Sequence, residues 1–343
     1  MSDHPIVLAG NYGSPYSLKM RAVLRYRQIP FRWVLRGSKW DDLPEPPVHL
    51  IPMIVYPNDD GSHGEVTIDS SPQIMRLEAE YQDRSVVPAD PALAFLDALI
   101  EDYADEWVTK AMYHYRWAYE PDIDKAGKLL PLASDLQMTS DLAQRSYDVF
   151  TQRQIGRREL VGSTDITQPI IEDSYERLLA IITELLASSD FVLGERPGRG
   201  DFGLYGQLSQ LVKWDPTSMN VAARRAPKVV HWVDRLDDLS WLPVETDRGW
   251  TSLDELPNAT HNLLAEIGRT YAPFLLANAE ALGSGADEVV VEIDARTYRQ
   301  APFGYQGKCL QWLRDGHASL ADTDRQRVDA VLSGTGCEAL FPA

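Results

Sequence analysis

The sequence of 343 residues has little cysteine, an excess of acidic over basic residues, and no long apolar run. Its two cysteines, Cys309 and Cys337, form neither a CxxC pair nor a metal-ligand spacing, so we expect free thiols and no metal site. No stretch approaches the ~20 apolar residues of a membrane span, and the first residues lack the basic region of a signal peptide. These absences predict a soluble cytoplasmic protein without a membrane partner.

The charge balance excludes a further class of protein. The formal net charge is −18, whereas sequence-independent nucleic-acid binding depends on Lys and Arg against phosphate, so we expect no nucleic-acid partner. Hydrophobic residues make up 44% of the chain, enough to bury a sizeable core. The length suits two domains at about 150 residues each.

The first 84 residues predict a small α/β domain. Short apolar or β-branched runs predict strands over residues 6–9, 31–35, 53–56 and 65–68, with helices over 15–27 and from about 72. The turn Asn58-Asp59-Asp60-Gly61 joins the last two strands as an antiparallel hairpin. We expect Ser70 or Ser71 to cap the helix that follows.

From Pro91 the pattern becomes helical, after a proline-containing linker over residues 84–90. Apolar residues at helical spacing predict helices over 91–119, 135–160, 168–188 and 227–236, and a buried helix that has Asp201 in its first turn. The remaining extension predicts helices over 261–282, 307–313 and 322–332, and a hairpin over 288–300 that turns at Asp294-Ala295. The predicted division is 1–84, an α/β domain; 91–245, an all-helical bundle; and 246–343, a C-terminal extension.

Ser14 stands where a strand passes into a helix. Serine is a strong N-cap residue, and Pro15 suits the first helical position. A hydroxyl at the positive end of a helix, beside unpaired backbone N–H groups, stabilises an anion such as a thiolate. A plain helix cap is the alternative, and these residues alone favour it.

Four motifs, in the same order, resemble the cytosolic glutathione transferase family. They are Ser14-Pro15-Tyr16 before the first helix, Ile51-Pro52 before the third strand, Asp69-Ser70-Ser71-Pro72 at the next helix, and Gly198–Phe202 at a buried helix. The resemblance, to serine-type members, spans residues 5–240 and leaves the extension outside. It implies a thioredoxin-like N-terminal domain and an all-helical second domain. Because members of this family are usually dimers, it also implies a homodimer.

The resemblance also implies glutathione as cosubstrate. Ser14 would donate a hydrogen bond to the glutathione sulfur and stabilise its thiolate, with Tyr12 as the rival donor. The motif Ser14-Pro15-Tyr16-Ser17 looks like a CxxC motif without its sulfurs, which disfavours a thioredoxin-like reductase.

The other motifs would hold the glutathione peptide. The backbone of Ile51, next to a cis Pro52, would pair with the cysteinyl main chain as a β-strand does. Asp69 and Ser70 would hold the γ-glutamyl ammonium and carboxylate. The candidates for the glycyl carboxylate lie in the segment 37–50 and are Lys39, Trp40 and His49.

Two positions depart from the family pattern. Leu50 stands where many members have Lys or Gln, and Gly198 replaces a Ser or Thr, which removes a cap hydroxyl and about 1 kcal/mol of local stability. The prediction is a glutathione transferase-like enzyme that attacks a hydrophobic electrophile by conjugation or thiolytic cleavage. The alternative is a non-catalytic binding or scaffold protein that uses its extension for interactions.

Two further features have a structural and a functional interpretation. Aromatic and basic residues of the 91–119 helix either line an electrophile pocket or, as is commoner at helical spacing, pack in the core; they are Trp107, Tyr113, His114, Tyr115, Arg116, Trp117 and Tyr119. Cys309 lies on an apolar helix, where a buried thiol is expected.

Overall fold

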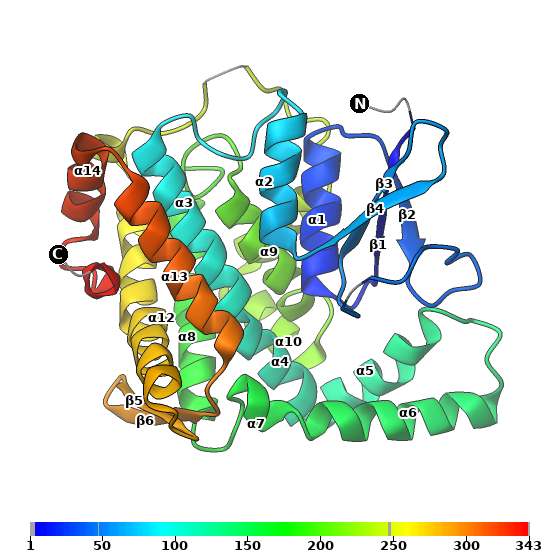
Figure 1. The fold of residues 1–343 in the computed structure, drawn as a ribbon. Helices are drawn as coiled ribbons and strands as arrows, with labels where there is room; N and C mark the ends of the chain where they lie inside the picture. The colour runs from blue at the N-terminus through cyan, green and yellow to red at the C-terminus, as the bar shows by residue number, and fades with distance from the viewer. Residues whose placement is uncertain (1–3, 47, 246–247, 342–343) are drawn as a thin grey trace.

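A four-stranded mixed sheet forms the N-terminal part of the protein. The computed structural model describes residues 4–46, 48–245 and 248–341. The first elements are β1 (Ile6–Gly10), α1 (Pro15–Tyr26), β2 (Phe31–Leu35), β3 (Met53–Pro57), β4 (His63–Ile68) and α2 (Ser70–Glu80). The strand order is β2-β1-β3-β4, with β1 parallel to β2 and antiparallel to β3, and β4 antiparallel to β3 as the turn at Asn58–Gly61 predicts. Together with α1 and α2, this sheet is a thioredoxin-like domain (Figure 1).

The predicted cap of α2 is wrong by one residue. The helix already begins at Ser70, and its N-cap is Asp69, whose side chain makes no cap hydrogen bond. The helix therefore leaves the carboxylate of Asp69 available for another contact.

The helical domain follows. Its elements are α3 (Pro91–Tyr103), the π-helix η1 (Ala104–Val108), α4 (Thr109–Ala118), α5 (Glu120–Leu132), α6 (Ser140–Ile155), α7 (Arg158–Val161), α8 (Gln168–Leu185), α9 (Arg199–Leu211), α10 (Pro216–Arg225) and α11 (Pro227–Leu236). The single helix predicted over 91–119 thus contains a π-helical turn, which is often found at functional sites. The helix predicted over 135–160 is two helices, which a turn at Gly156-Arg157 separates.

The C-terminal extension packs on the helical domain. It contains η2 (Leu253–Glu255), α12 (Asn258–Ser284), β5 (Val289–Ile293), β6 (Arg296–Gln300), α13 (Gly304–Ser319), α14 (Asp322–Leu332) and η3 (Cys337–Leu340). Helix α12 lies along α8, while α13 and α14 pack against α3 (Figure 1). The hairpin turns at Asp294-Ala295 as predicted, with φ of 54° and 56°.

Buried residues of the extension join the core of the helical domain. Leu263, Phe274 and Leu310 belong to the same hydrophobic cluster as Leu96 of α3 and Leu178 of α8. The expected boundary between residues 245 and 246 touches residues 246–247, which lie outside the described residues, so the division into 91–245 and 246–343 stays a prediction. Across the described ranges, no helix is both long and apolar enough to cross a membrane.

A carboxylate from another helix replaces the cap hydroxyl that Gly198 lacks. Asp97 of α3 accepts hydrogen bonds from the backbone N–H groups of Arg199 (3.1 Å) and Gly200 (2.9 Å) at the start of α9. Asp201 accepts from Gly198 N at 2.9 Å, which preserves its half of the capping box. A Cβ on Gly198 would lie 2.4 Å from Asp97 Oδ1, so glycine leaves the room that this carboxylate needs.

Candidate functional site

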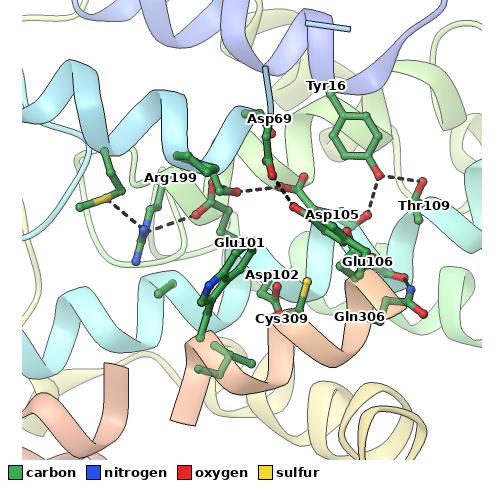
Figure 2. Close-up of a pocket in the computed structure, with 18 of the residues that line it drawn as sticks. Tyr16, Asp69, Glu101, Asp102, Asp105, Glu106, Thr109, Arg199, Gln306 and Cys309 are labelled. Atoms are coloured by element: carbon green, nitrogen blue, oxygen red, sulfur yellow. Dashed lines mark hydrogen bonds and ion pairs between the residues drawn. The ribbon is translucent and has the colours of Figure 1, made fainter. Parts of the chain in front are cut away.

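One cavity of about 940 Å³ lies where the N-terminal domain, the helical domain and the extension meet. Four of the predicted site residues border it: Ile51, Pro52, Asp69 and Ser70. The first two precede β3, and their peptide bond is cis, as the family resemblance implies. Asp69 and Ser70 begin α2, and Figure 2 shows Asp69 directed toward the carboxylates of α3 and η1.

The two candidates for thiol activation lie outside the residues that border this cavity. Ser14 caps α1, and its Oγ accepts from Ser17 N at 3.3 Å, so its hydroxyl hydrogen is left to donate elsewhere. Tyr12 is 47% exposed; its ring lies 5.8 Å from that of Trp33, with the guanidinium of Arg21 5.4 Å from its centroid.

Lys39 and His49 are also not brought to the described cavity lining. Lys39 lies over the ring of Trp40 at 4.7 Å, and that ring is 70% exposed. His49 Nδ1 lies 3.4 Å from a carboxylate oxygen of Glu45 in an exposed pair. Neighbouring Leu50, in contrast, borders the cavity.

Tyr16 is a cavity residue that the sequence reasoning missed as a candidate. Its hydroxyl donates to the backbone oxygen of Asp105 at 2.8 Å and lies 3.3 Å from Thr109 Oγ1 (Figure 2). Burial, with the charges of Glu106 and Asp105, raises the pKa of Tyr16 well above its usual value. The hydroxyl is therefore a neutral donor, and its place in Ser14-Pro15-Tyr16 was the signal for it.

The turn that carries Ser14 is held from the helical domain. Arg116 of α4 donates to Gly13 O at 2.8 Å, and the same guanidinium is paired with buried Asp215 at 2.9 Å. Gln210 of α9 donates to Tyr12 O at 3.3 Å. These contacts fix the backbone before α1 independently of Ser14's own side chain.

A buried lysine links the two domains beneath the cavity. Lys19 of α1 donates to Glu101 at 2.7 Å, to Asp105 at 2.5 Å and to Ser70 Oγ at 3.3 Å. Burial disfavours the charge of Lys19, but Asp105 and Glu101 outweigh this effect and raise its pKa. Because Lys19 occupies an acceptor position of the Ser70 hydroxyl, that hydroxyl retains its hydrogen for a ligand.

The wall formed by η1 and the end of α3 carries several carboxyl groups, and not all of them are ionised. Burial raises the pKa of Asp102 to about 7 and, with Asp102 and Asp105 nearby, that of Glu106 to about 8. Burial also lowers the pKa of Lys110, farther along the same wall, to about 7. Near neutral pH Glu106 is largely uncharged, and Asp102 and Lys110 are only partly charged, so the wall suits a ligand that is mostly apolar.

The opposite wall comes from the extension, which the sequence motifs do not cover. Phe303, Tyr305, Gln306, Cys309 and Trp312, in and just before α13, border the cavity. Cys309 is 2% exposed, as its apolar helix predicts. The sequence offered no signal that this helix, more than 200 residues after α2, lies across from Asp69.

The aromatic residues of the 91–119 helix divide between core and cavity. Tyr113 borders the cavity, whereas Trp107, Tyr115 and Trp117 are at most 3% exposed and pack in the interior. His114 is buried between Ser163 (2.8 Å) and Glu172 (3.1 Å). Core packing therefore explains most of the aromatic residues of this helix.

The fold and the cavity define the class of this protein as a thioredoxin-like domain followed by a helical domain. Residues 8–85 match the family model of the glutathione S-transferase N-terminal domain. The family match therefore describes the N-terminal domain and extends to neither the helical domain nor the extension.

Several solved structures are similar to the chain. A glutathione S-transferase from Methylobacterium radiotolerans, in complex with glutathione sulfonate, is 20% identical over 71% of this chain and 99% of its own, with a TM-score of 0.41. A glutathione transferase from Phanerochaete chrysosporium is 14% identical over 71% and 99%, with a TM-score of 0.46. A beta-etherase from Sphingobium sp. strain SYK-6 is 17% identical over 68% and 94%, with a TM-score of 0.43. No curated protein matches the sequence.

Proposed function

We propose that the protein is a glutathione transferase-like enzyme that binds glutathione against Ile51, Pro52, Asp69 and Ser70. The observation that carries the proposal is that these four residues, from two separate motifs, border one cavity of about 940 Å³ in a glutathione S-transferase N-terminal domain. A cavity of this size lies within the range of small-molecule sites, about 300–1,000 Å³.

Each residue offers a group that glutathione needs. The backbone of Ile51 pairs with the cysteinyl main chain, and Asp69 accepts from the γ-glutamyl ammonium. Ser70 donates to the γ-glutamyl carboxylate, because Lys19 directs its hydroxyl and the N-terminus of α2 favours an anion. Lys39 and His49 remain the candidates for the glycyl carboxylate.

Thiol activation falls to Ser14 in this proposal. The N-terminus of α1 supplies a positive partial charge, which favours a thiolate. Tyr12 is the alternative donor, but its ring packs against Trp33 and Arg21 at the surface, which supports Ser14. The thiolate would attack a hydrophobic electrophile held near Phe95, Trp312 and Leu313, by conjugation or thiolytic cleavage.

Ser14→Ala tests this assignment. Loss of one hydrogen bond to a charged group costs about 1.5–3 kcal/mol, so the pKa of enzyme-bound glutathione should rise by about one to two units. The measurement is the pH dependence of thiolate absorbance and of turnover with an aryl halide, with Tyr12→Phe as the matched control. An unchanged profile in Ser14→Ala with a shifted one in Tyr12→Phe would assign the role to Tyr12.

A non-catalytic binding or scaffold protein is the second candidate. The exposure of Lys39 and His49 and the apolar Leu50 at the cavity favour it, since they leave the glycyl end without a basic partner in place. Calorimetry separates the two, because a scaffold releases no heat with millimolar glutathione. Homodimer formation and a cytoplasmic location are kept as parts of the proposal, the first measurable by light scattering.

A further inference from the structure

We infer that the C-terminal extension completes the glutathione site within the same chain, with Tyr305 as the positioning residue for Asp69. The inference rests on the proposed function, since it concerns how Asp69 receives the γ-glutamyl ammonium. It gives the extension a role in ligand selection: the site prefers a γ-glutamyl peptide with a free α-amino group over the same peptide without one.

The contact itself joins two residues that are 236 positions apart. The Tyr305 hydroxyl donates to Asp69 Oδ2 at 2.7 Å. Asp69 occupies the N-cap position of α2, yet its carboxylate makes no cap bond and its φ is 75°. A non-glycine residue in this region is strained, and such strain persists where the surroundings enforce it, frequently at binding sites. The carboxylate is thus released from its own helix and held by the extension.

Tyr305 is fixed at its own end. Phe303, two residues before it, donates from its N–H to Asn278 Oδ1 at 2.8 Å and accepts from Asn278 Nδ2 at 3.1 Å. Asn278 is fully buried in α12, so these two hydrogen bonds anchor the first turn of α13. The ring of Tyr305 also packs edge-on against Trp312 at 5.9 Å. The donor therefore reaches Asp69 from a rigid support.

The chemistry of the pair suits an ammonium. Burial and the neighbouring Asp69 carboxylate raise the pKa of Tyr305, so the phenol keeps its proton and remains a donor. Oδ2 of Asp69 accepts the hydrogen bond from this phenol, which leaves Oδ1 with both lone pairs for a ligand N–H. Without the phenol, the carboxylate would be free to rotate, and an ammonium would have to order it on binding.

Tyr305→Phe tests the inference with two ligands, glutathione and its desamino analogue, which lacks only the α-amino group. The full-length wild type should bind glutathione more tightly than the analogue. The variant should lower that preference about tenfold, with a higher KM for glutathione and little change in kcat or in affinity for the analogue. The change removes one oxygen and keeps the aromatic ring, so the packing against Trp312 is retained.

Tyr271→Phe is the matched control. Its hydroxyl, also in the extension, donates to the carboxylate of Asp102 at the same distance of 2.7 Å, but not to Asp69. It should leave the ligand preference unchanged. Asp69→Asn should abolish the preference, and adding Tyr305→Phe to it should then change nothing further, because Tyr305 acts through Asp69.

The outcomes separate the inference from the proposed function. If the wild type binds neither ligand, the proposed function is wrong and the inference falls with it. If the wild type prefers glutathione and Tyr305→Phe retains the whole preference, the inference is wrong while the proposed function stands. An equal loss of affinity for both ligands would also overturn the inference. A residue that only packs in the structure would affect ligands with and without the ammonium alike.

Discussion

Lys19 offers the sharpest test of how the two domains are joined under the cavity. Its ammonium is fully buried, and it donates to Glu101 at 2.7 Å and to Asp105 at 2.5 Å. In Lys19→Met the chain keeps a side chain of similar length but leaves two carboxylates without their partner. We expect the variant to be substantially less stable than the wild type.

The magnitude follows from what is left behind. Removing one partner of a buried ion pair costs about 3–5 kcal/mol, because the remaining charge is neither solvated nor paired. Burial raises the pKa of Asp105 to about 6 even with Lys19 present, whereas Lys19 and Arg199 outweigh burial at Glu101 and lower its pKa. Without Lys19, both carboxyls take up protons more readily. The loss should therefore be smaller at pH 5 than at pH 8.

The chain supplies a matched control in Lys110. This lysine is also buried, but it donates to Gln300 Oε1 at 2.6 Å and to Val161 O at 3.3 Å, which are neutral acceptors. Lys110→Met removes a donor from two neutral acceptors, and Gln300 Oε1 keeps its hydrogen bond from the Tyr298 hydroxyl, so the expected cost is about 1–2 kcal/mol.

Urea unfolding followed by tryptophan fluorescence measures both variants. We expect a lower midpoint for Lys19→Met than for Lys110→Met, and a partial return toward the wild type in Lys19→Met/Glu101→Gln/Asp105→Asn, where the lysine and both of its carboxylate partners are neutral. Equal midpoints for the two lysine variants, or a triple variant less stable than Lys19→Met, would refute the reasoning.

The remaining predictions concern a cap and a pH dependence. Gly198→Ala should lower the melting temperature, because its Cβ would meet Asp97 Oδ1 at 2.4 Å and because alanine is poorer than glycine at an N-cap position; a melting temperature equal to or above that of the wild type would show that Asp97 does not need this space. Glu106→Gln should flatten the pH dependence of stability: burial, with Asp102 and Asp105, raises the pKa of Glu106 to about 8 in the folded chain, against about 4.3 unfolded. Its stabilising contribution is then present below about pH 4.3 and lost as the pH rises toward 8, so calorimetric melting temperatures of wild type and variant should diverge in favour of the variant at high pH. If the melting temperatures of the two proteins changed with pH in parallel, the pH dependence would come from a group other than Glu106.

Local patterns predicted the fold well. The strands of the N-terminal domain, the hairpin at Asp294-Ala295 and the helix over residues 322–332 follow from alternation, turn residues and helical spacing, which act within a few positions. The motif residues Ile51 and Asp69 were also identifiable, because they stand in short segments with recognisable order. The π-helical turn at Ala104–Val108 has no such local signature.

The contacts that complete the site lay beyond the reach of local patterns. Asp97 caps a helix that begins 102 residues later, and Tyr305 reaches Asp69 across 236 residues. Nothing in the sequence near Gly198 indicates that a carboxylate from another helix needs its space. Likewise, the sequence predicts a short helix over 307–313. Nothing in it indicates that the longer helix observed, Gly304–Ser319, lines the cavity. Tertiary pairing of this kind depends on how the helices pack, which local propensity does not encode.

The central claim is that the cavity bordered by Ile51, Pro52, Asp69 and Ser70 is a glutathione site. The most direct measurement is a calorimetric titration of the full-length protein with glutathione, alongside Ser70→Ala. We expect saturable heat with one glutathione per chain at millimolar ligand or below, and weaker binding in Ser70→Ala. No heat at millimolar glutathione, or equal affinity in the two proteins, would contradict it.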